Sequence, residues 1–157
     1  MTAQTTSGGD AAIIENKAQL IEWLEAGCKP RDSWRVGTEH EKFPFFTDTL
    51  RPVPYDGERS IRALLAGLRA CHADWEPIME GDCIIGLLDT AGGGCITLEP
   101  AGQFELSGAP LANIHQTCTE VHTHFSHLRT VADPLGIGFL GIGASPLWTR
   151  DETPVMP

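Results

Sequence analysis

The stretch Thr97–Pro110 most constrains the fold of this chain, because it places two carboxylates and an amide among residues typical of a buried strand. Glu99, Gln103 and Glu105 alternate there with apolar side chains. An ionised glutamate taken out of water is costly unless a cation, a metal ion or hydrogen-bond donors replace its hydration. Lys and Arg are absent from residues 92–119. A metal ion is therefore the expected partner of these carboxylates.

A second segment, Gly37–Phe43, has the same character. Successive side chains of a strand point to opposite faces, so Glu39 and Glu41 share one face, with Cα atoms about 6.6 Å apart. On spacing alone, solvated glutamates on an exposed strand face are the simpler explanation. The alternative is a pair of metal ions about 3.5–4 Å apart, each bound by one of these carboxylates.

The same alternation places Glu99, Gln103 and Glu105 on the face opposite Phe104 and Leu106, which are expected in the core. The four glutamates at positions 39, 41, 99 and 105 can then converge on one concave face. Hard oxygen ligands of this kind suit Mg²⁺ or Mn²⁺, which keep some waters and bridge the phosphate oxygens of a nucleotide.

The composition is that of a soluble globular protein. The chain has 157 residues, of which 41% are hydrophobic and 20% charged, and its formal net charge is -10. This charge disfavours a nucleic-acid backbone or an anionic membrane surface as a partner. No secretory signal and no apolar window of ~18 residues are present, so we expect a cytosolic protein. The five cysteines lack CxxC spacing, which disfavours a disulfide framework and a structural zinc site.

The pattern along the chain predicts an α+β fold, with a largely antiparallel sheet and helices packed on one of its faces. Residues 1–12 are expected to be a disordered tail ahead of one domain over residues 13–157. The remaining elements are predicted as a helix over 14–26, a strand over 35–46, a helix capped by Asp56, a hairpin over 75–88, and strands over 95–99 and 136–143.

The longest helix is predicted over residues 107–132, where apolar residues alternate spacings of three and four. Cys118 belongs to that apolar stripe, which indicates a packed thiol. Four histidines on this helix, at positions 115, 122, 124 and 127, form no HExxH motif, so they are expected to be solvated or at the boundary of the core. His40 alternates to the strand face opposite the glutamates, where it is expected to pack or to hydrogen-bond.

Several motifs carry a resemblance to a known family. The chain resembles the plant and proteobacterial type of glutamate–cysteine ligase from about Trp34 to its last residue. The motifs are Gly37-Thr-Glu-His-Glu-Lys-Phe43, Glu80-Gly-Asp82 followed by Ile84-Ile-Gly-Leu87, Leu98-Glu-Pro-Ala-Gly-Gln-Phe-Glu-Leu-Ser-Gly-Ala-Pro110, His115-Gln-Thr-Cys118 and Pro154-Val-Met-Pro157.

This resemblance implies a glutamine-synthetase-like catalytic fold, of which the chain is the N-terminal part. It implies that Glu39, Glu41, Glu99 and Glu105 bind Mg²⁺ (or Mn²⁺), and that Gln103 contacts substrate or nucleotide. The implied reaction is phosphorylation of the γ-carboxylate of glutamate by ATP, followed by attack of the cysteine amine. The product is γ-glutamylcysteine, in the first step of glutathione biosynthesis.

The resemblance also bears on assembly and regulation. Cys118 lies in a motif where some plant members of the family use cysteine pairs for redox control, and its partner is expected beyond residue 157. A partial sheet would present an unpaired edge, which favours a homodimer or another association. The chain alone is expected to be a poor catalyst. Ala101 stands where the family usually has glycine, and its Cβ would strain a backbone of positive φ beside the ligands.

Two other functions remain open. Glu99 and Glu105 suit the acid and the base or nucleophile of a glycoside hydrolase, if their carboxyls are roughly 5–9.5 Å apart. Sugar sites usually contain stacking aromatic residues, however, and Tyr55 is the only tyrosine. The other possibility is a non-catalytic remnant of the ligase family. Metal-dependent nucleotide binding distinguishes the ligase from both alternatives.

Overall fold

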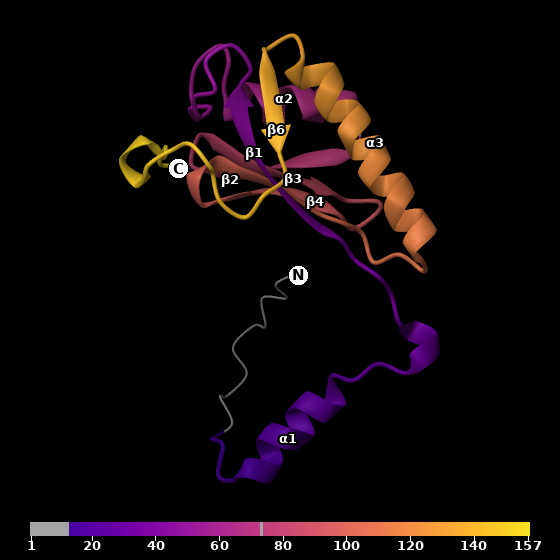
Figure 1. Ribbon diagram of the computed structural model, residues 1–157. Helices are drawn as coiled ribbons and strands as arrows, with labels where there is room; N and C mark the ends of the chain where they lie inside the picture. The colour runs from indigo at the N-terminus through magenta and orange to yellow at the C-terminus, as the bar shows by residue number, and fades with distance from the viewer. Residues whose placement is uncertain (1–12, 73) are drawn as a thin grey trace. The chain divides into compact units, whose positions relative to one another are not determined.

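The structure is a computed structural model, and it describes residues 13–72 and 74–157. It divides into two compact units, with the boundary between Trp34 and Arg35. Figure 1 shows the first unit as a helical segment and the second as a sheet with two helices. The predicted disordered tail, residues 1–12, lies outside the described residues.

The first unit contains helix α1, Lys17–Ala26, and the short 3-10 helix η1, Arg31–Ser33. A capping box begins α1: the Asn16 side chain accepts the Gln19 N–H at 3.2 Å, and the Gln19 side chain accepts the Asn16 N–H at 3.3 Å. Gly27 follows the last turn. The predicted helix over 14–26 is therefore confirmed, with its start three residues later, where the cap supplies the first acceptors.

The second unit is built on a six-stranded sheet in the order β2-β3-β4-β5-β1-β6, in which every pairing is antiparallel. This arrangement confirms the predicted α+β class and antiparallel sheet. The strands are β1 (Glu39–Phe46), β2 (Trp75–Glu80), β3 (Cys83–Asp89), β4 (Cys95–Glu99), β5 (Gln103–Ser107) and β6 (Ile137–Leu140).

Strand β1 changes partner halfway along its length. Its first half, from Glu39 to Lys42, pairs with β5, and its second half, from Phe43 to Phe46, pairs with β6. Pro44 lies in the second half and has no backbone N–H to donate to a ladder. The predicted hairpin over 75–88 is confirmed as β2 and β3, which are joined at Gly81 in a positive-φ turn.

Helices α2 (Ile61–Cys71) and α3 (Ile114–Ala132) contribute to one core on the same face of the sheet. The apolar side chains of that core include Leu64, Leu65 and Leu68 of α2, Leu128 of α3, and Leu87, Ile96, Phe104 and Leu106 of the sheet. The two helices approach closely at Gly67, where an added Cβ would overlap Val131 Cγ1. Among the described residues, no helix is both long and apolar enough to cross a membrane.

Both helix starts differ from the sequence-based expectation. Ser60, not Asp56, caps α2: its hydroxyl accepts the Ala63 N–H at 3.1 Å, while Asp56 forms an ion pair with Arg62 at 2.7 Å. Helix α3 begins at Ile114, not at residue 107, because residues 103–107 are used by β5. Asn113 caps it by accepting the N–H groups of the first turn.

The buried stripe of α3 also differs from the predicted one. The helix buries Thr117, His124, Leu128 and Ala132, whereas Cys118 is exposed. The predicted stripe is correct at the C-terminal end of the helix, where it meets α2 and the sheet. Nearer the N-terminal end, the side of the helix that faces the core is not the predicted one, and Thr117 and His124 lie on it. The expectation of a packed thiol at Cys118 is therefore wrong.

Candidate functional site

The strand register places all of the predicted ligands on one surface. Glu41 is the direct partner of Glu105 across β1 and β5, and Glu105 is also opposite Thr97 of β4. Glu99 is opposite Gln103. Because side chains alternate along a strand, these residues share the face of β1, β4 and β5 that points away from Phe104 and Leu106. Glu39, opposite Ser107, lies on the same face, which we call the glutamate face.

Neutral donors hold two of these carboxylates in place. Glu105 accepts the Thr97 hydroxyl on Oε2 at 3.0 Å and the Ser107 hydroxyl on Oε1 at 2.9 Å. Gln103 Nε2 donates to Glu41 Oε2 at 2.9 Å. Glu105 and Gln103 are only 7% and 8% exposed. Strand partners therefore fix these side chains, and no cation is used to do so.

The glutamates also act on one another electrostatically. Loss of hydration raises the pKa of Glu99, and a hydrogen bond with Glu105 and the charges of Glu105, Glu41 and Glu39 raise it further. Ion pairs in the described part of the chain include those of Glu152, Asp48 and Asp56, which lie outside this face. The glutamate face is thus a concentration of negative charge that favours binding of a cation.

Lys42 was not identified by the sequence reasoning as part of this region. It alternates to the helix side of β1, where it is fully buried, and its Nζ donates to the backbone oxygens of His40 at 2.9 Å and Phe104 at 3.0 Å. Burial lowers the pKa of Lys42 to about 8, against the opposing effect of the Glu105 charge. The sequence signal was the run Glu39-His-Glu-Lys42, in which strand alternation places the lysine on the face opposite the two glutamates.

The donor set suits a divalent cation by atom type and charge, because carboxylate oxygens are the ligands that Mg²⁺ and Mn²⁺ prefer. As the side chains stand, however, the described residues contain no group of three or more His, Cys, Asp or Glu arranged to hold a metal ion. The role of the four glutamates as ligands therefore stays a prediction.

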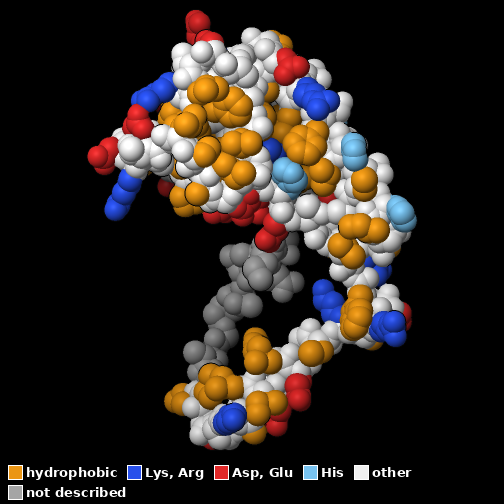
Figure 2. Space-filling view, viewed as in Figure 1, with side chains coloured by type: hydrophobic (Ala, Val, Ile, Leu, Met, Phe, Trp, Pro, Cys, Tyr) orange, Lys and Arg blue, Asp and Glu red, His pale blue; other side chains and the backbone are white. Residues whose placement is uncertain are grey.

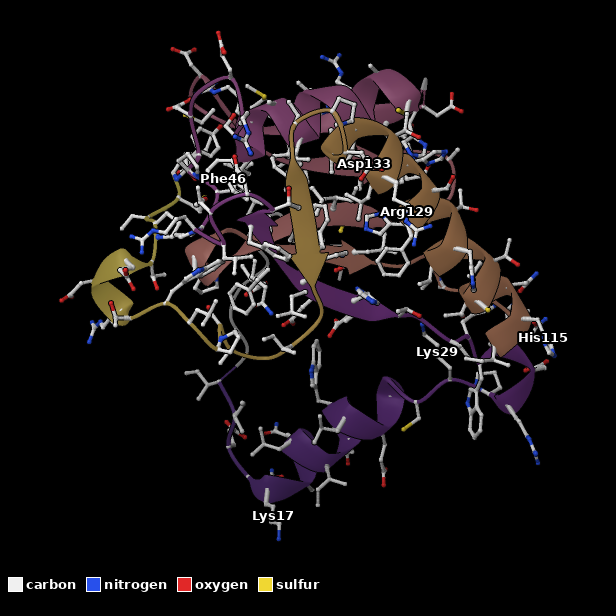
Figure 3. All side chains as sticks on the ribbon, turned by 45° about the horizontal axis from the view of Figure 1, so that its top comes forward. Lys17, Lys29, Phe46, His115, Arg129 and Asp133 are labelled. Carbon is white, nitrogen blue, oxygen red and sulfur yellow. The ribbon has the colours of Figure 1, made fainter. Side chains whose placement is uncertain are left out.

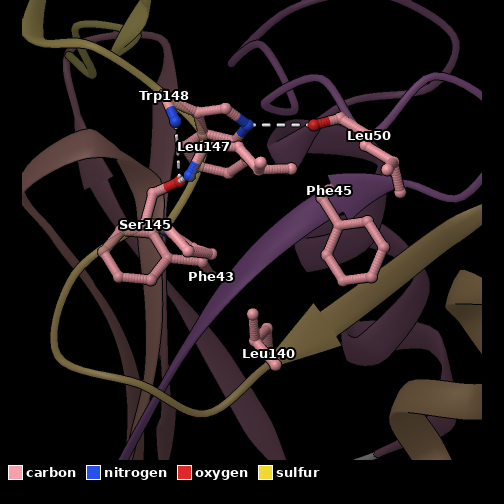
Figure 4. A pocket seen from close by; sticks show the side chains of 8 residues that line it. Phe43, Phe45, Leu50, Leu140, Ser145, Leu147 and Trp148 are labelled. Carbon is pink, nitrogen blue, oxygen red and sulfur yellow. Dashed lines mark hydrogen bonds between the residues drawn. The ribbon is translucent and has the colours of Figure 1, made fainter.

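An apolar pocket of about 100 Å³ adjoins the glutamate face. Phe43 follows Glu41 on the same side of β1 and contacts the Trp148 ring edge-on, with centroids 5.8 Å apart. Trp148 Nε1 donates to the Leu50 oxygen at 2.9 Å (Figure 4). Figure 2 shows apolar side chains gathered on this part of the surface, with acidic side chains along their lower margin. The region thus combines negative charge with a place for an apolar group.

The remaining sequence candidates lie elsewhere. Cys118 is exposed, with Sγ 3.5 Å from His122 Nδ1, and its redox role stays a prediction. The expectation of a solvated or boundary His124 is wrong, since this side chain is only 6% exposed. His40 packs edge-on against Phe125 with ring centroids 5.0 Å apart, as predicted.

The family model for Glutamate-cysteine ligase family 2 (GCS2) matches residues 35–157. Similar proteins include chloroplastic glutamate–cysteine ligases of Medicago truncatula and Arabidopsis thaliana, each 53% identical over 141 residues. These alignments cover 90% of this chain, but 27% of the first relative and 26% of the second. The enzyme of Solanum lycopersicum is 52% identical over 94% of this chain and 27% of its own length.

These relatives correct one expectation and establish the family. The cytosolic location expected from the sequence is contradicted, because the relatives are named as chloroplastic enzymes. The chain spans about a quarter of the length of the relatives that it matches. The family match covers the whole sheet unit, including every residue of the glutamate face. The chain belongs to glutamate–cysteine ligase family 2.

Proposed function

We propose that this chain contributes the metal-binding part of a glutamate–cysteine ligase. The observation that carries this proposal is the convergence of Glu39, Glu41, Glu99 and Glu105 on one sheet face, with Lys42 on the other. The family membership supports the same conclusion. It also argues against the glycoside hydrolase, because the matched relatives are ligases.

In this proposal the four glutamates hold Mg²⁺ or Mn²⁺. When bound, the ion neutralises charge on the phosphate oxygens of ATP. Gln103 positions Glu41 through its amide, and Thr97 and Ser107 position Glu105 through their hydroxyls. These neutral donors orient the carboxylates without neutralising them, so the negative charge remains available to the ion.

The proposed reaction joins the γ-carboxyl of glutamate to the amine of cysteine. Transfer of the terminal phosphoryl group of ATP to the carboxylate gives an acyl phosphate and ADP. Attack of the amine then forms the amide and releases phosphate. Since the chain covers about a quarter of its relatives' length, we expect it to bind metal and nucleotide but to turn over far below the ~1–10³ s⁻¹ typical of enzymes.

Titration calorimetry with Mn²⁺ and with a non-hydrolysable ATP analogue tests the proposal. We expect Mn²⁺-dependent binding of the analogue, and weaker binding in Glu105→Gln and Glu41→Gln. Glu76→Gln is the matched control, because Glu76 is an exposed glutamate on the same side of the sheet, but on β2, which β3 separates from β4.

Three outcomes would contradict the proposal. Nucleotide binding that needs no metal would mean that the glutamates are not ligands. Equal losses in Glu105→Gln and Glu76→Gln would show a non-specific charge effect. Absence of any metal-dependent binding would favour the non-catalytic remnant.

A further inference from the structure

The last segment of the chain returns to the sheet after strand β6. It leaves β6 at Leu140 and passes through the 3-10 helix η3 (Arg150–Glu152). We call residues 145–157 the C-terminal strap, and Figure 3 shows it in yellow, leaving β6 and turning back to the sheet. The strap contains the motif Pro154-Val-Met-Pro157, to which the proposed function gives no role.

Several contacts fasten the strap beside strand β1. The Trp148 ring packs edge-on against Phe43, with centroids 5.8 Å apart. Further along, Glu152 forms an ion pair with Arg51, in the loop that follows β1. The strap is therefore held at two points before the chain reaches Met156.

Met156 lies against the turn between β4 and β5. This turn is the 3-10 segment η2, Pro100–Gly102. A Cβ added at Gly102 would lie 2.8 Å from Met156 Cε, 3.1 Å from Met156 Sδ and 3.6 Å from Ile61 Cδ1. Met156 is also one of the partly buried side chains that pack against the core. The backbone of the turn is thus enclosed between the thioether of the strap and the first residue of α2.

The η2 turn has a backbone conformation that needs support. Ala101 and Gly102 are consecutive, and both have positive φ, at 69° and 71°. A residue with a Cβ is strained in this region, and such a conformation persists only when the surrounding structure holds it. Gly102 is buried. The contacts of Met156 and Ile61 are therefore placed to hold the turn.

The turn joins two residues of the glutamate face. Glu99 directly precedes it and Gln103 directly follows it, and the two are opposite each other in the β4–β5 ladder. The Gln103 N–H donates to the Pro100 oxygen and closes the turn, while the Gln103 side chain donates to Glu41. A change in the turn therefore displaces Glu99 directly and Glu41 through Gln103.

We propose that Met156 is a positioning residue for the metal site. By packing on Gly102 it holds the η2 turn, and with it Glu99 and Gln103, in the arrangement that binds the ion. This inference rests on the proposed function, because the ion is the Mg²⁺ or Mn²⁺ of that function. An unbranched thioether suits the role, since its rotatable bonds let it fill an irregular gap beside a backbone.

The first measurement is amide hydrogen exchange in the metal-free, ¹⁵N-labelled 157-residue chain. Met156→Ala removes the contact with the turn, so we expect exchange several-fold faster at residues 103–105 and unchanged at residues 84–88 of β3. Met156→Leu keeps an apolar side chain of similar volume and should restore the wild-type rates. Val155→Ala is the matched control, because Val155 belongs to the same motif and is 91% exposed.

The second measurement is the Mn²⁺ affinity of the folded variants, by titration calorimetry. We expect Met156→Ala to weaken binding roughly 10-fold, at the lower end of the ~10–100-fold loss that follows when the partners of metal ligands are changed. Met156→Leu and Val155→Ala should bind Mn²⁺ as the wild type does. Met156→Val, which shortens the side chain but keeps it apolar, replaces the alanine variant if that variant unfolds.

The outcomes separate this inference from the proposed function. Absence of Mn²⁺ binding by the wild type would remove the proposed function, and the positioning role with it. If the wild type binds Mn²⁺, equal affinity in Met156→Ala would overturn the inference alone and leave Met156 a merely structural residue. Unchanged exchange at residues 103–105, equal effects of Met156→Ala and Val155→Ala, or no rescue by Met156→Leu would also overturn it.

Discussion

Glu41 and Glu105 stand directly opposite each other across the β1–β5 ladder. Like charges so placed are destabilising, by a few tenths of a kcal/mol to ~1 kcal/mol. We therefore expect Glu41→Gln to raise the free energy of unfolding in a chelating buffer, measured by urea denaturation. The glutamine still accepts the Gln103 amide. Glu76→Gln, on β2 opposite Leu88, should change stability much less, and a stability loss in Glu41→Gln would contradict this reading of the pair.

Ala101 has φ of 69°, so the backbone of positive φ anticipated at this position is confirmed. The left-handed region costs a residue with a Cβ about 1–2 kcal/mol, and part of this is offset by the greater unfolded-state entropy of glycine. Ala101→Gly should therefore stabilise the chain by about 0.5–1 kcal/mol in urea unfolding. Ala112→Gly, at an exposed position outside the positive-φ residues, should destabilise it. Equal effects of the two substitutions would refute the strain argument.

Gly67 allows α2 and α3 to approach at Val131. Alanine would gain about 1 kcal/mol of helix propensity at this position, but overpacking typically costs ~1–3 kcal/mol. We expect a net loss of stability for Gly67→Ala. The double-mutant cycle with Val131→Ala supplies the control: the alanine at position 67 should be tolerated once the valine methyls are removed. Additive effects would show that the close approach does not limit this position.

His124 should make stability dependent on pH. Burial, with the charges of Lys42, His40, His127 and His72, lowers its pKa from 6.5 to about 3. Below about pH 6.5 the unfolded chain therefore binds a proton on this imidazole, whereas the folded chain does not. Stability is full above that pH and falls as the pH drops towards 3, by up to ~1.4 kcal/mol per pH unit.

Urea unfolding of wild type and His124→Gln between pH 7.5 and 5 measures this effect. The stability of wild type relative to the variant should decline with falling pH. His115→Gln, at an exposed position on the same helix, is the control. A difference between wild type and His124→Gln that does not change with pH would rule out the assignment.

The glutamate face could be predicted because it depends on a local rule. The period of two fixes the relation of Glu39 to Glu41 and of Gln103 to Glu105 within each strand. The sequence did not contain the pairing that makes Glu41 the partner of Glu105. That pairing depends on contacts between segments far apart in the chain: alternation allowed the four glutamates to converge, and the family resemblance implied that they bind one metal site, but neither predicted which residues pair.

The errors arose where two local solutions competed. Asp56 and Ser60 are both good N-cap residues, and the ion pair of Asp56 with Arg62 leaves the cap to Ser60. On α3, apolar spacing alone could not identify a buried histidine. His124 faces inward because the helix packs against a partly polar cavity, and the hydrophobic pattern carries no information about such a cavity.

The strand order has a consequence for folding kinetics. Strands β2 to β5 follow one another as hairpins, so Thr97 and Glu105, eight residues apart, meet through a short loop. Glu41 and its hydrogen-bond partner Gln103, in contrast, are 62 residues apart in the chain. Because long loops close at a greater entropic cost, the hairpin contacts should form before the contacts of β1. In folding kinetics we therefore expect Thr97→Ala to have a transition-state φ-value near one and Phe45→Leu a φ-value near zero. The reverse order would contradict this sequence of events. Strand β1, together with the β6 strand that pairs with it, is then expected to dock after the β4–β5 hairpin, and the repulsion between Glu41 and Glu105 arises only in this closing step.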